Sequence, residues 1–129
     1  MAYQNYRDLE VYQLAHTLAI EIHKMSLGLP NLEKFEQAAQ IRKSAKSIAV
    51  NIVEGFGRRR YKNEFIQFLV YSLASCDETR EHLDILLETD SIENKQEYEY
   101  FKESYEKLGR KLTNFIKTVE EKHLTPKKN

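Results

Sequence analysis

The chain has 129 residues, and its 20 lysines and arginines balance 20 aspartates and glutamates, so the formal net charge at pH 7 is zero. This balance argues against a generic nucleic-acid binder, and a hydrophobic content of 41% excludes an intrinsically disordered chain. At this length there is room for one core of ordinary size, so we expect a single domain over residues 1–129.

The cysteine content and the apolar runs indicate the compartment. Cys76 is the only cysteine, so no intrachain disulfide can form, and a reducing compartment fits. The first residues, MAYQNYRDLE, lack the apolar core of a signal peptide, and no apolar run approaches the ~20 residues that a membrane span needs. We therefore expect a cytoplasmic protein without membrane association.

Apolar residues at spacings of three and four predict a first helix over residues 8–28. Its stripe consists of Leu9, Val11, Tyr12, Leu14, Ala15, Leu18, Ala19, Ile22 and Met25. Gly28 is a candidate C-cap, and Pro30 cannot continue the helix. Asn31 is a candidate N-cap for the helix that follows.

The second helix, predicted over residues 33–57, carries both a packing signal and much of the positive charge. At 100° per residue, one broad side is apolar and contains Ala38, Ile41, Ala45, Ile48, Ala49, Ile52, Val53 and Phe56. Another side, an arc of about 80°, contains Gln40, Ser44, Ser47, Asn51, Glu54 and Arg58. This small, amide-containing side favours close contact with another helix or another subunit, and Glu54 would pair with a cation across that contact.

The third helix is predicted over residues 63–89, with Asn63 as a candidate N-cap, and the fourth over residues 94–122. The buried stripe of the third helix is Phe65, Phe68, Leu69, Ser72, Cys76, Leu83, Leu86 and Leu87. Ile66, Val70 and Leu73 make its first half apolar nearly all round, which indicates either a subunit interface or a wide core stripe. The fourth helix has the cleanest pattern, with Tyr98, Phe101, Tyr105, Leu108, Leu112, Phe115 and Val119 alternating spacings of three and four.

Short connections place consecutive helices antiparallel. No segment shows the period-two alternation of a strand over any useful length. The sequence therefore predicts an all-α fold, an antiparallel up-down-up-down four-helix bundle, with a frayed tail over residues 123–129.

Charge is unevenly distributed along the chain. Residues 42–62 hold seven basic residues and one acidic residue, a net +6, whereas residues 77–106 hold three basic and eleven acidic residues, a net −8. Either the folded bundle presents a basic and an acidic region, or neighbouring helices neutralise each other. The candidate nucleic-acid-binding residues are Arg42, Lys43, Lys46, Arg58, Arg59, Arg60 and Lys62.

The arginine run 58–60 has two interpretations. Its forked donors can contact phosphates, and Tyr61 beside it can stack on a base. Alternatively, the cations offset the negative end of the second helix and pair with the acidic run around Glu78–Asp90.

The sequence offers no constellation for catalysis, metal binding or a cofactor. Gln40, Ser44, Ser47, Asn51 and Glu54 have no histidine nearby in sequence, so we interpret them as an interface or structural network. A di-metal carboxylate bundle needs two Glu-x-x-His motifs, and only Glu120-x-x-His123 fits. We interpret Cys76 as a buried structural thiol and the Glu78–His82 spacing as a surface hydrogen bond. We expect no enzymatic activity.

The motif SIAVNIVEG at residues 47–55 carries a specific resemblance. With QIRKSAK at 40–46 and EFIQFLVYSLASCDE at 64–78, the chain resembles the bacterial four-helix-bundle family named after proteins encoded by intervening sequences in 23S ribosomal RNA genes. The match runs from about Tyr6 to Thr118. The chain departs from the family pattern at Lys43, where arginine is favoured, at Gln37, where an apolar residue is usual, and at Tyr12, where tryptophan is common.

The resemblance implies a homo-oligomer, a pentamer. A relative in the same superfamily, the accessory protein of diversity-generating retroelements, works with a reverse transcriptase and RNA, so the resemblance implies association with RNA by analogy. We expect a non-catalytic homo-oligomer that binds RNA through the basic end of the second helix. The alternative is a protein–protein interaction scaffold without nucleic-acid binding, whose acidic and basic faces meet other proteins or its own copies.

Overall fold

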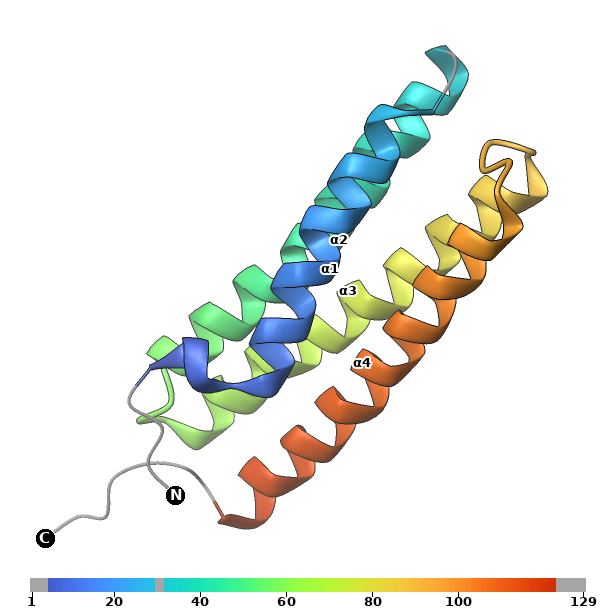
Figure 1. Cartoon of the computed structure of the whole chain (residues 1–129). Helices are drawn as coiled ribbons and strands as arrows, with labels where there is room; N and C mark the ends of the chain where they lie inside the picture. The colour runs from blue at the N-terminus through green and yellow to red at the C-terminus, as the bar shows by residue number, and fades with distance from the viewer. Residues whose placement is uncertain (1–4, 30–31, 123–129) are drawn as a thin grey trace, which may run out of the picture.

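The computed structural model describes residues 5–29 and 32–122. Within these ranges the chain forms a short 3-10 helix, η1 (Tyr6–Asp8), and four α-helices: α1 (Glu10–Leu27), α2 (Leu32–Gly57), α3 (Lys62–Glu88) and α4 (Lys95–Lys122). Both α1 and α3 pack against α2 and α4, so the four helices surround one core (Figure 1). The predicted all-α antiparallel four-helix bundle is confirmed.

The helices begin and end within two residues of the predicted positions. The amide of Gly28 donates to the carbonyl of Met25, so this glycine is the C-cap of α1. The prediction that Asn63 caps α3 is wrong. The first turn closes earlier because the amide of Phe65 donates to the carbonyl of Tyr61, which makes Tyr61 the N-cap. Asn31 and the predicted frayed tail lie outside the described residues.

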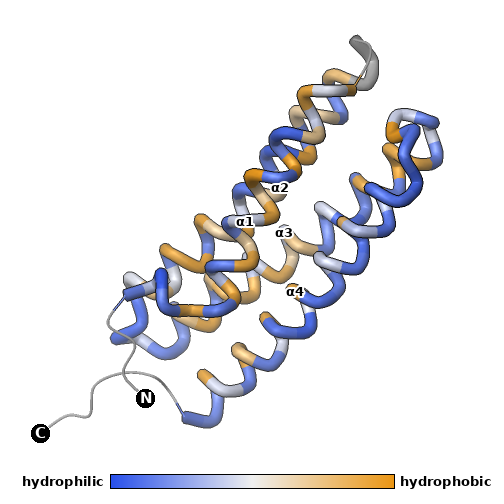
Figure 2. Tube along the Cα trace, viewed as in Figure 1, coloured by the Kyte–Doolittle hydropathy of each residue, from blue (hydrophilic) through white to orange (hydrophobic). Residues whose placement is uncertain are grey.

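The core lies along the whole length of the bundle, and each helix contributes fully buried side chains, among them Ile22, Ile48, Leu69 and Leu108. Hydrophilic residues dominate α4, and its apolar positions form a narrow stripe between them (Figure 2). That stripe also includes Ile116, which is buried, whereas two predicted members, Tyr98 and Phe115, are partly buried; Phe115 packs edge-on to Phe65.

The additional apolar residues in the first half of α3 differ in how far they are buried. Ile66 and Leu73 are partly buried against the core, which supports a wide core stripe for these two positions. Val70 is 46% exposed and is left for solvent or for another molecule.

Candidate nucleic-acid interface

The polar side of α2 faces α3 in its middle part. The hydroxyl of Thr79 lies 2.9 Å from that of buried Ser44, and the hydroxyls of Ser47 and Ser75 lie 2.9 Å apart. Asn51 donates to the carbonyl and the hydroxyl of Ser47 on its own helix. The sequence left open whether this side of α2 contacts another helix or another subunit. Within the chain, Ser44 and Ser47 contact a helix, α3.

Small residues allow this close packing. A Cβ added to Gly55 would lie 3.1 Å from the Cβ of Phe68 and 3.3 Å from the carbonyl oxygen of Phe65. The hydroxyl of Ser72 donates to the carbonyl of Ile48 across the same contact, at 2.8 Å. We call this row of hydroxyls on α2 and α3 (Ser44, Ser47, Ser72, Ser75 and Thr79) the hydroxyl seam.

Two other members of the polar side, Gln40 and Glu54, are exposed, unlike Ser44 and Ser47. The Glu54 carboxylate lies 3.5 Å from the guanidinium of Arg58, which follows the end of α2. Within the described chain Glu54 therefore pairs with a nearby cation and not across a helix contact, and its pairing across a subunit contact stays a prediction.

The basic candidate residues fall into two groups. Arg42, Lys43 and Lys46 lie near the middle of α2, whereas Arg58, Arg59 and Arg60 follow its end and Lys62 is the first residue of α3. Arg58 lies twelve positions after Lys46, which corresponds to about 18 Å at the rise of an α-helix. The fold therefore does not gather all seven residues in one place.

In the first group, Arg42 has a structural contact. Its guanidinium donates to the hydroxyl of buried Ser26, at 2.8 Å, and lies over the ring of Phe35. This bond ties α2 to α1. Lys43 and Lys46 are exposed and form no ion pair or hydrogen bond within the described residues.

In the second group, two arginines are engaged by their own neighbourhood. The Arg58 guanidinium lies 2.8 Å from a Glu64 carboxylate oxygen and 4.9 Å from the centre of the Phe68 ring. The hydrogen bond that Arg58 donates to the Glu64 carboxylate also raises the pKa of Arg58. Arg59 lies 4.0 Å from the centre of the Phe56 ring and donates to the Phe56 carbonyl at 3.0 Å, so it covers the carboxyl end of α2.

The remaining side chains of the turn are available. Arg60 is exposed, Lys62 is half-buried, and neither forms an ion pair or side-chain hydrogen bond within the described residues. Tyr61 lies between them and is 59% exposed. We call Arg60, Tyr61 and Lys62 the turn cluster.

The acidic run Glu78–Asp90 does not pair with these arginines, contrary to one of the two interpretations. The antiparallel course of α3 carries this run to the other end of the bundle (Figure 1). There Asp84 accepts hydrogen bonds from Lys102 and Tyr98, at 2.8 and 2.7 Å.

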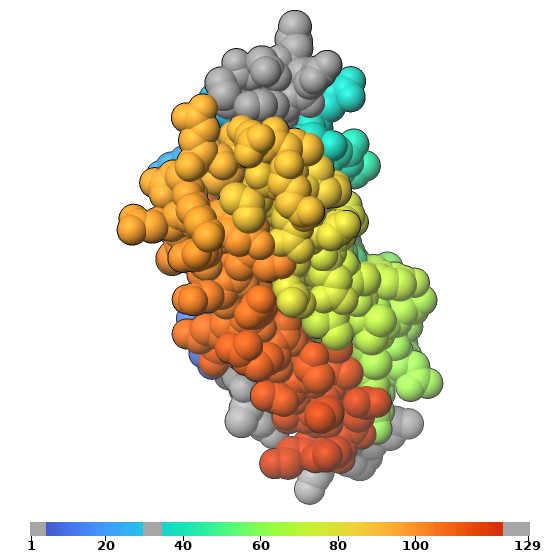
Figure 3. Space-filling model, turned by 90° about the vertical axis from the view of Figure 1, so that its right-hand side faces the viewer, coloured from blue at the N-terminus to red at the C-terminus, as the bar shows by residue number. Residues whose placement is uncertain are grey.

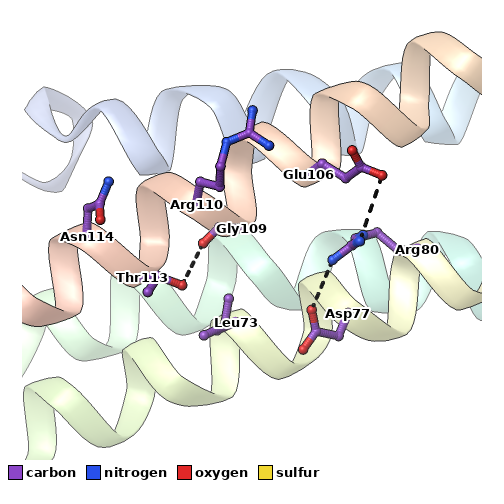
Figure 4. Close-up of a pocket in the computed structure, with 8 residues that line it drawn as sticks. All are labelled: Leu73, Asp77, Arg80, Glu106, Gly109, Arg110, Thr113 and Asn114. Atoms are coloured by element: carbon purple, nitrogen blue, oxygen red, sulfur yellow. Dashed lines mark hydrogen bonds and ion pairs between the residues drawn. The ribbon is translucent and has the colours of Figure 1, made fainter.

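A groove of about 540 Å³ lies between α3 and α4, on the face shown in Figure 3. Three of its four charged residues pair with one another, since Arg80 lies 3.6 Å from Asp77 and 3.8 Å from Glu106, whereas Arg110 forms no ion pair within the described residues (Figure 4). The Thr113 hydroxyl donates to the carbonyl of Gly109. The groove therefore presents no hydroxyl or thiol held by a general base.

Other candidate reactive groups have structural surroundings. Cys76 is buried, its thiol donates to the carbonyl of Tyr105, and burial raises its pKa to about 12. His82 lies 3.2 Å from Glu78, so the predicted hydrogen bond is confirmed. Within residues 5–29 and 32–122, no cluster of three metal-ligating side chains is found, and no helix has the length and apolarity of a membrane span.

The sequence analysis missed two features of this region. Ser75 and Thr79 of the hydroxyl seam were not singled out, although with Ser72 they recur at spacings of three and four on α3. The contacts of Arg58 and Arg59 with phenylalanine rings were missed as well, because they depend on the path of the turn.

Known families and solved structures include proteins similar to this chain. The family model described as 23S rRNA-intervening sequence protein matches residues 7–114. A crystal structure described as a protein with unknown function from the S23 ribosomal protein family of Bacteroides thetaiotaomicron VPI-5482 is similar, with a TM-score of 0.76 and 28% sequence identity. The similarity covers 84% of this chain and 96% of that one. No curated protein matches. Because the family model spans most of the bundle, the chain belongs to the 23S rRNA-intervening sequence protein family.

Proposed function

We propose that this chain is a non-catalytic, cytoplasmic, homo-oligomeric bundle that binds RNA through the α2–α3 turn. The observation that carries the proposal is the turn cluster, in which two cations that form no ion pair within residues 5–29 and 32–122 adjoin an exposed tyrosine in sequence. Cations attract phosphates by charge alone, and an aromatic ring beside them offers a stacking surface for a base.

The neighbouring charges support this assignment. Glu54 and Glu64, the carboxylates nearest to the turn cluster in sequence, both pair with Arg58, so they repel an approaching phosphate less than free acids would. The larger acidic run lies at the opposite end of the bundle. The similar crystal structure is described as belonging to a ribosomal protein family, which is consistent with RNA as the partner by analogy.

Self-association would strengthen weak contacts. The outward side of α2 exposes Val50 by 58%, and α3 exposes Val70 and Tyr71 by 46% each. Burying such side chains against further copies would remove apolar surface from water. A closed ring, for which the family resemblance suggests five copies, would repeat the turn cluster around one axis and multiply its contacts with a long RNA.

The test compares the parent with R60A/K62A and with a control, K24A/K95A, which removes the same charge at the other end of the bundle. The probe is a structured RNA with single-stranded loops, and affinity is measured as a function of salt. We expect R60A/K62A to bind more weakly, and its log affinity to fall less steeply with log salt by about 1.4, from ~0.7 for each lost phosphate contact. The control should bind like the parent.

Two outcomes would contradict the proposal. If the parent does not bind RNA at low salt, or if both variants lose affinity equally, binding through the turn is wrong and the protein-interaction scaffold is favoured. Light scattering on the same samples tests assembly. A particle of 15.3 kDa, the mass of one chain, at micromolar concentration would exclude the oligomer.

A further inference from the structure

We infer that the turn cluster recognises an unpaired nucleotide, whose base stacks on Tyr61 while its flanking phosphates meet Arg60 and Lys62. The inference rests on the proposed function and names the part of the nucleic acid that the turn contacts.

The backbone of Tyr61 is held in place although its side chain is free. Its amide donates to the carbonyl of Arg58 at 2.9 Å, and its carbonyl accepts from the amide of Phe65 at 3.0 Å. The residue has an extended backbone at the N-cap of α3 and forms no side-chain capping bond. A ring on a fixed backbone loses little conformational freedom when a base stacks on it.

The other exposed tyrosines of the described chain, Tyr71 and Tyr100, each have a hydrogen-bond partner and a neighbouring aromatic ring. The hydroxyl of Tyr71 accepts from Gln67, and its ring packs edge-on to Phe68. The hydroxyl of Tyr100 donates to Glu21, and its ring packs against Phe101. Tyr61 has neither a hydroxyl partner nor a ring neighbour within the described residues, and it is more exposed than either, at 59%. Its ring is therefore the one that is free to receive a base.

The cations around Tyr61 have separate tasks. Arg58 and Arg59 are held against Phe68 and Phe56, and Arg58 also pairs with nearby carboxylates. Arg60 and Lys62 flank Tyr61 directly and have no ion pair within the described chain. As the sequence neighbours of Tyr61, these two cations are the ones that we assign to the phosphates on either side of the stacked nucleotide.

This arrangement favours an unpaired nucleotide over a duplex. In a double helix the faces of the bases are covered by their neighbours, so an aromatic side chain stacks only on bases that are splayed out in loops, bulges or single strands. Cations alone would bind the phosphates of either form. The ring is what would make the turn discriminate between them.

The experiment uses the full-length protein with three probes of the same sequence: a single-stranded RNA of about 12 nucleotides, the corresponding DNA and the paired RNA duplex. The variants are Y61A, Y61F and, as the control, Y100A at the other end of the bundle. A 2-aminopurine base in the single strands reports stacking by a change in its fluorescence.

We expect Y61A to lower the affinity for single-stranded RNA by about tenfold and to abolish the fluorescence change, because it removes the stacking surface. Y61F keeps the ring and should bind like the parent, as should Y100A. The affinity for the duplex should be the same for all variants. Single-stranded DNA should respond to Y61A as RNA does if the base alone is read, and bind more weakly if the ribose hydroxyl is also contacted.

Three results would overturn the inference. The first is an unchanged affinity of Y61A for single-stranded RNA. The second is an equal loss of affinity for the duplex, and the third is a loss in Y61F as large as in Y61A. If Y61A binds single-stranded RNA like the parent, or if Y61F loses as much affinity as Y61A, while R60A/K62A still binds more weakly, the inference about Tyr61 is wrong but the proposed function is kept. If the parent binds none of the probes, the inference and the proposed function are both wrong. Because Tyr61 lies outside the core, thermal unfolding of Y61A should match that of the parent.

Discussion

At the scale of single residues, the two glycines inside the long helices have different reasons to be there. Gly55 lies against α3, where an added Cβ would be 3.1 Å from Phe68 and 3.3 Å from a backbone oxygen. A Cβ on Gly109 would meet only the Cys76 sulfur, at 3.9 Å, which is an ordinary contact. Packing therefore requires glycine at position 55 and not at position 109.

This difference predicts opposite effects of the same substitution. We expect G109A to raise the free energy of unfolding by about 0.5–1 kcal/mol, since alanine loses less backbone entropy in a helix. G55A should lower it by about 1–3 kcal/mol, because α2 and α3 must move apart to accept the methyl group. Urea unfolding of the two variants measures both, and a shift of the same sign in both would contradict the geometry.

At the scale of helix pairs, the hydroxyl seam holds α2 to α3 by polar contacts inside an otherwise apolar core. Ser44 and Thr79 are both buried, and the Thr79 hydroxyl also bonds the carbonyl of Ser75 on its own helix, at 2.8 Å. Each hydroxyl of the seam therefore depends on the other helix for part of its hydrogen bonding. Removing both partners of such a pair therefore costs less than the sum of the two single removals, because the second removal no longer leaves an unpaired hydroxyl.

A double-mutant cycle on this pair tests that dependence. We expect T79V and S44A each to destabilise the protein by about 1–2 kcal/mol, and the double variant to cost about 0.5–1 kcal/mol less than their sum. As a control, S44A combined with T113V should be additive, because Thr113 lies on α4 and bonds its own helix. Additivity in both cycles, measured by urea unfolding, would show that the Ser44–Thr79 contact contributes nothing.

The same helix pairs show how far the sequence reaches. Periodicity identifies which side of a helix is buried, and the stripe of α4 was predicted almost completely because its heptad spacing is regular and its other positions are charged. Periodicity does not identify the neighbour, so the sequence could not decide whether Ser44 and Ser47 meet a helix or a subunit. The observed partner depends on the register between α2 and α3.

The candidate site was predictable in composition and not in arrangement. The charge run at residues 58–62 is visible in the sequence. The path of the turn, however, determines that Arg58 forms an ion pair with Glu64 and that the Arg59 guanidinium lies over the Phe56 ring. Arg42 was assigned to nucleic-acid binding with the others, whereas the structure shows that it joins α2 to α1. Side chains at the ends of helices have contacts that no helical period encodes.

At the scale of the whole molecule, charge is separated along the bundle axis. The α2–α3 turn with its free cations lies at one end, and the acidic end of α3 with the start of α4 lies at the other (Figure 1). This separation follows from the antiparallel topology, because residues 42–62 end at one turn and residues 77–106 span the next. At the acidic end, Lys102 lies 2.8 Å from Asp84 and offsets part of the negative charge.

The pairing at the acidic end predicts a pH dependence of global stability. Burial acts to raise the pKa of Asp84, but the hydrogen bonds from Lys102 and Tyr98 outweigh it, and the pKa lies below its ordinary value. In the unfolded chain the carboxyl titrates near ~3.9, so the unfolded state takes up a proton first as the pH falls. The stabilisation is therefore complete above that value and is lost as the pH falls through the lower pKa of the folded state.

The variant D84N isolates this contribution, because asparagine keeps the shape of the side chain and removes its titration. In urea unfolding from about pH 7 down to about pH 3, we expect the stability of the parent to fall more steeply with acid than that of D84N. A matched variant, D77N, removes a carboxylate that is more exposed and lies 3.6 Å from Arg80, so it should follow the parent more closely. Parallel acid curves for the parent and D84N would mean that the Asp84–Lys102 contact does not persist in solution. The joint between α3 and α4 at this end would then depend on apolar packing alone.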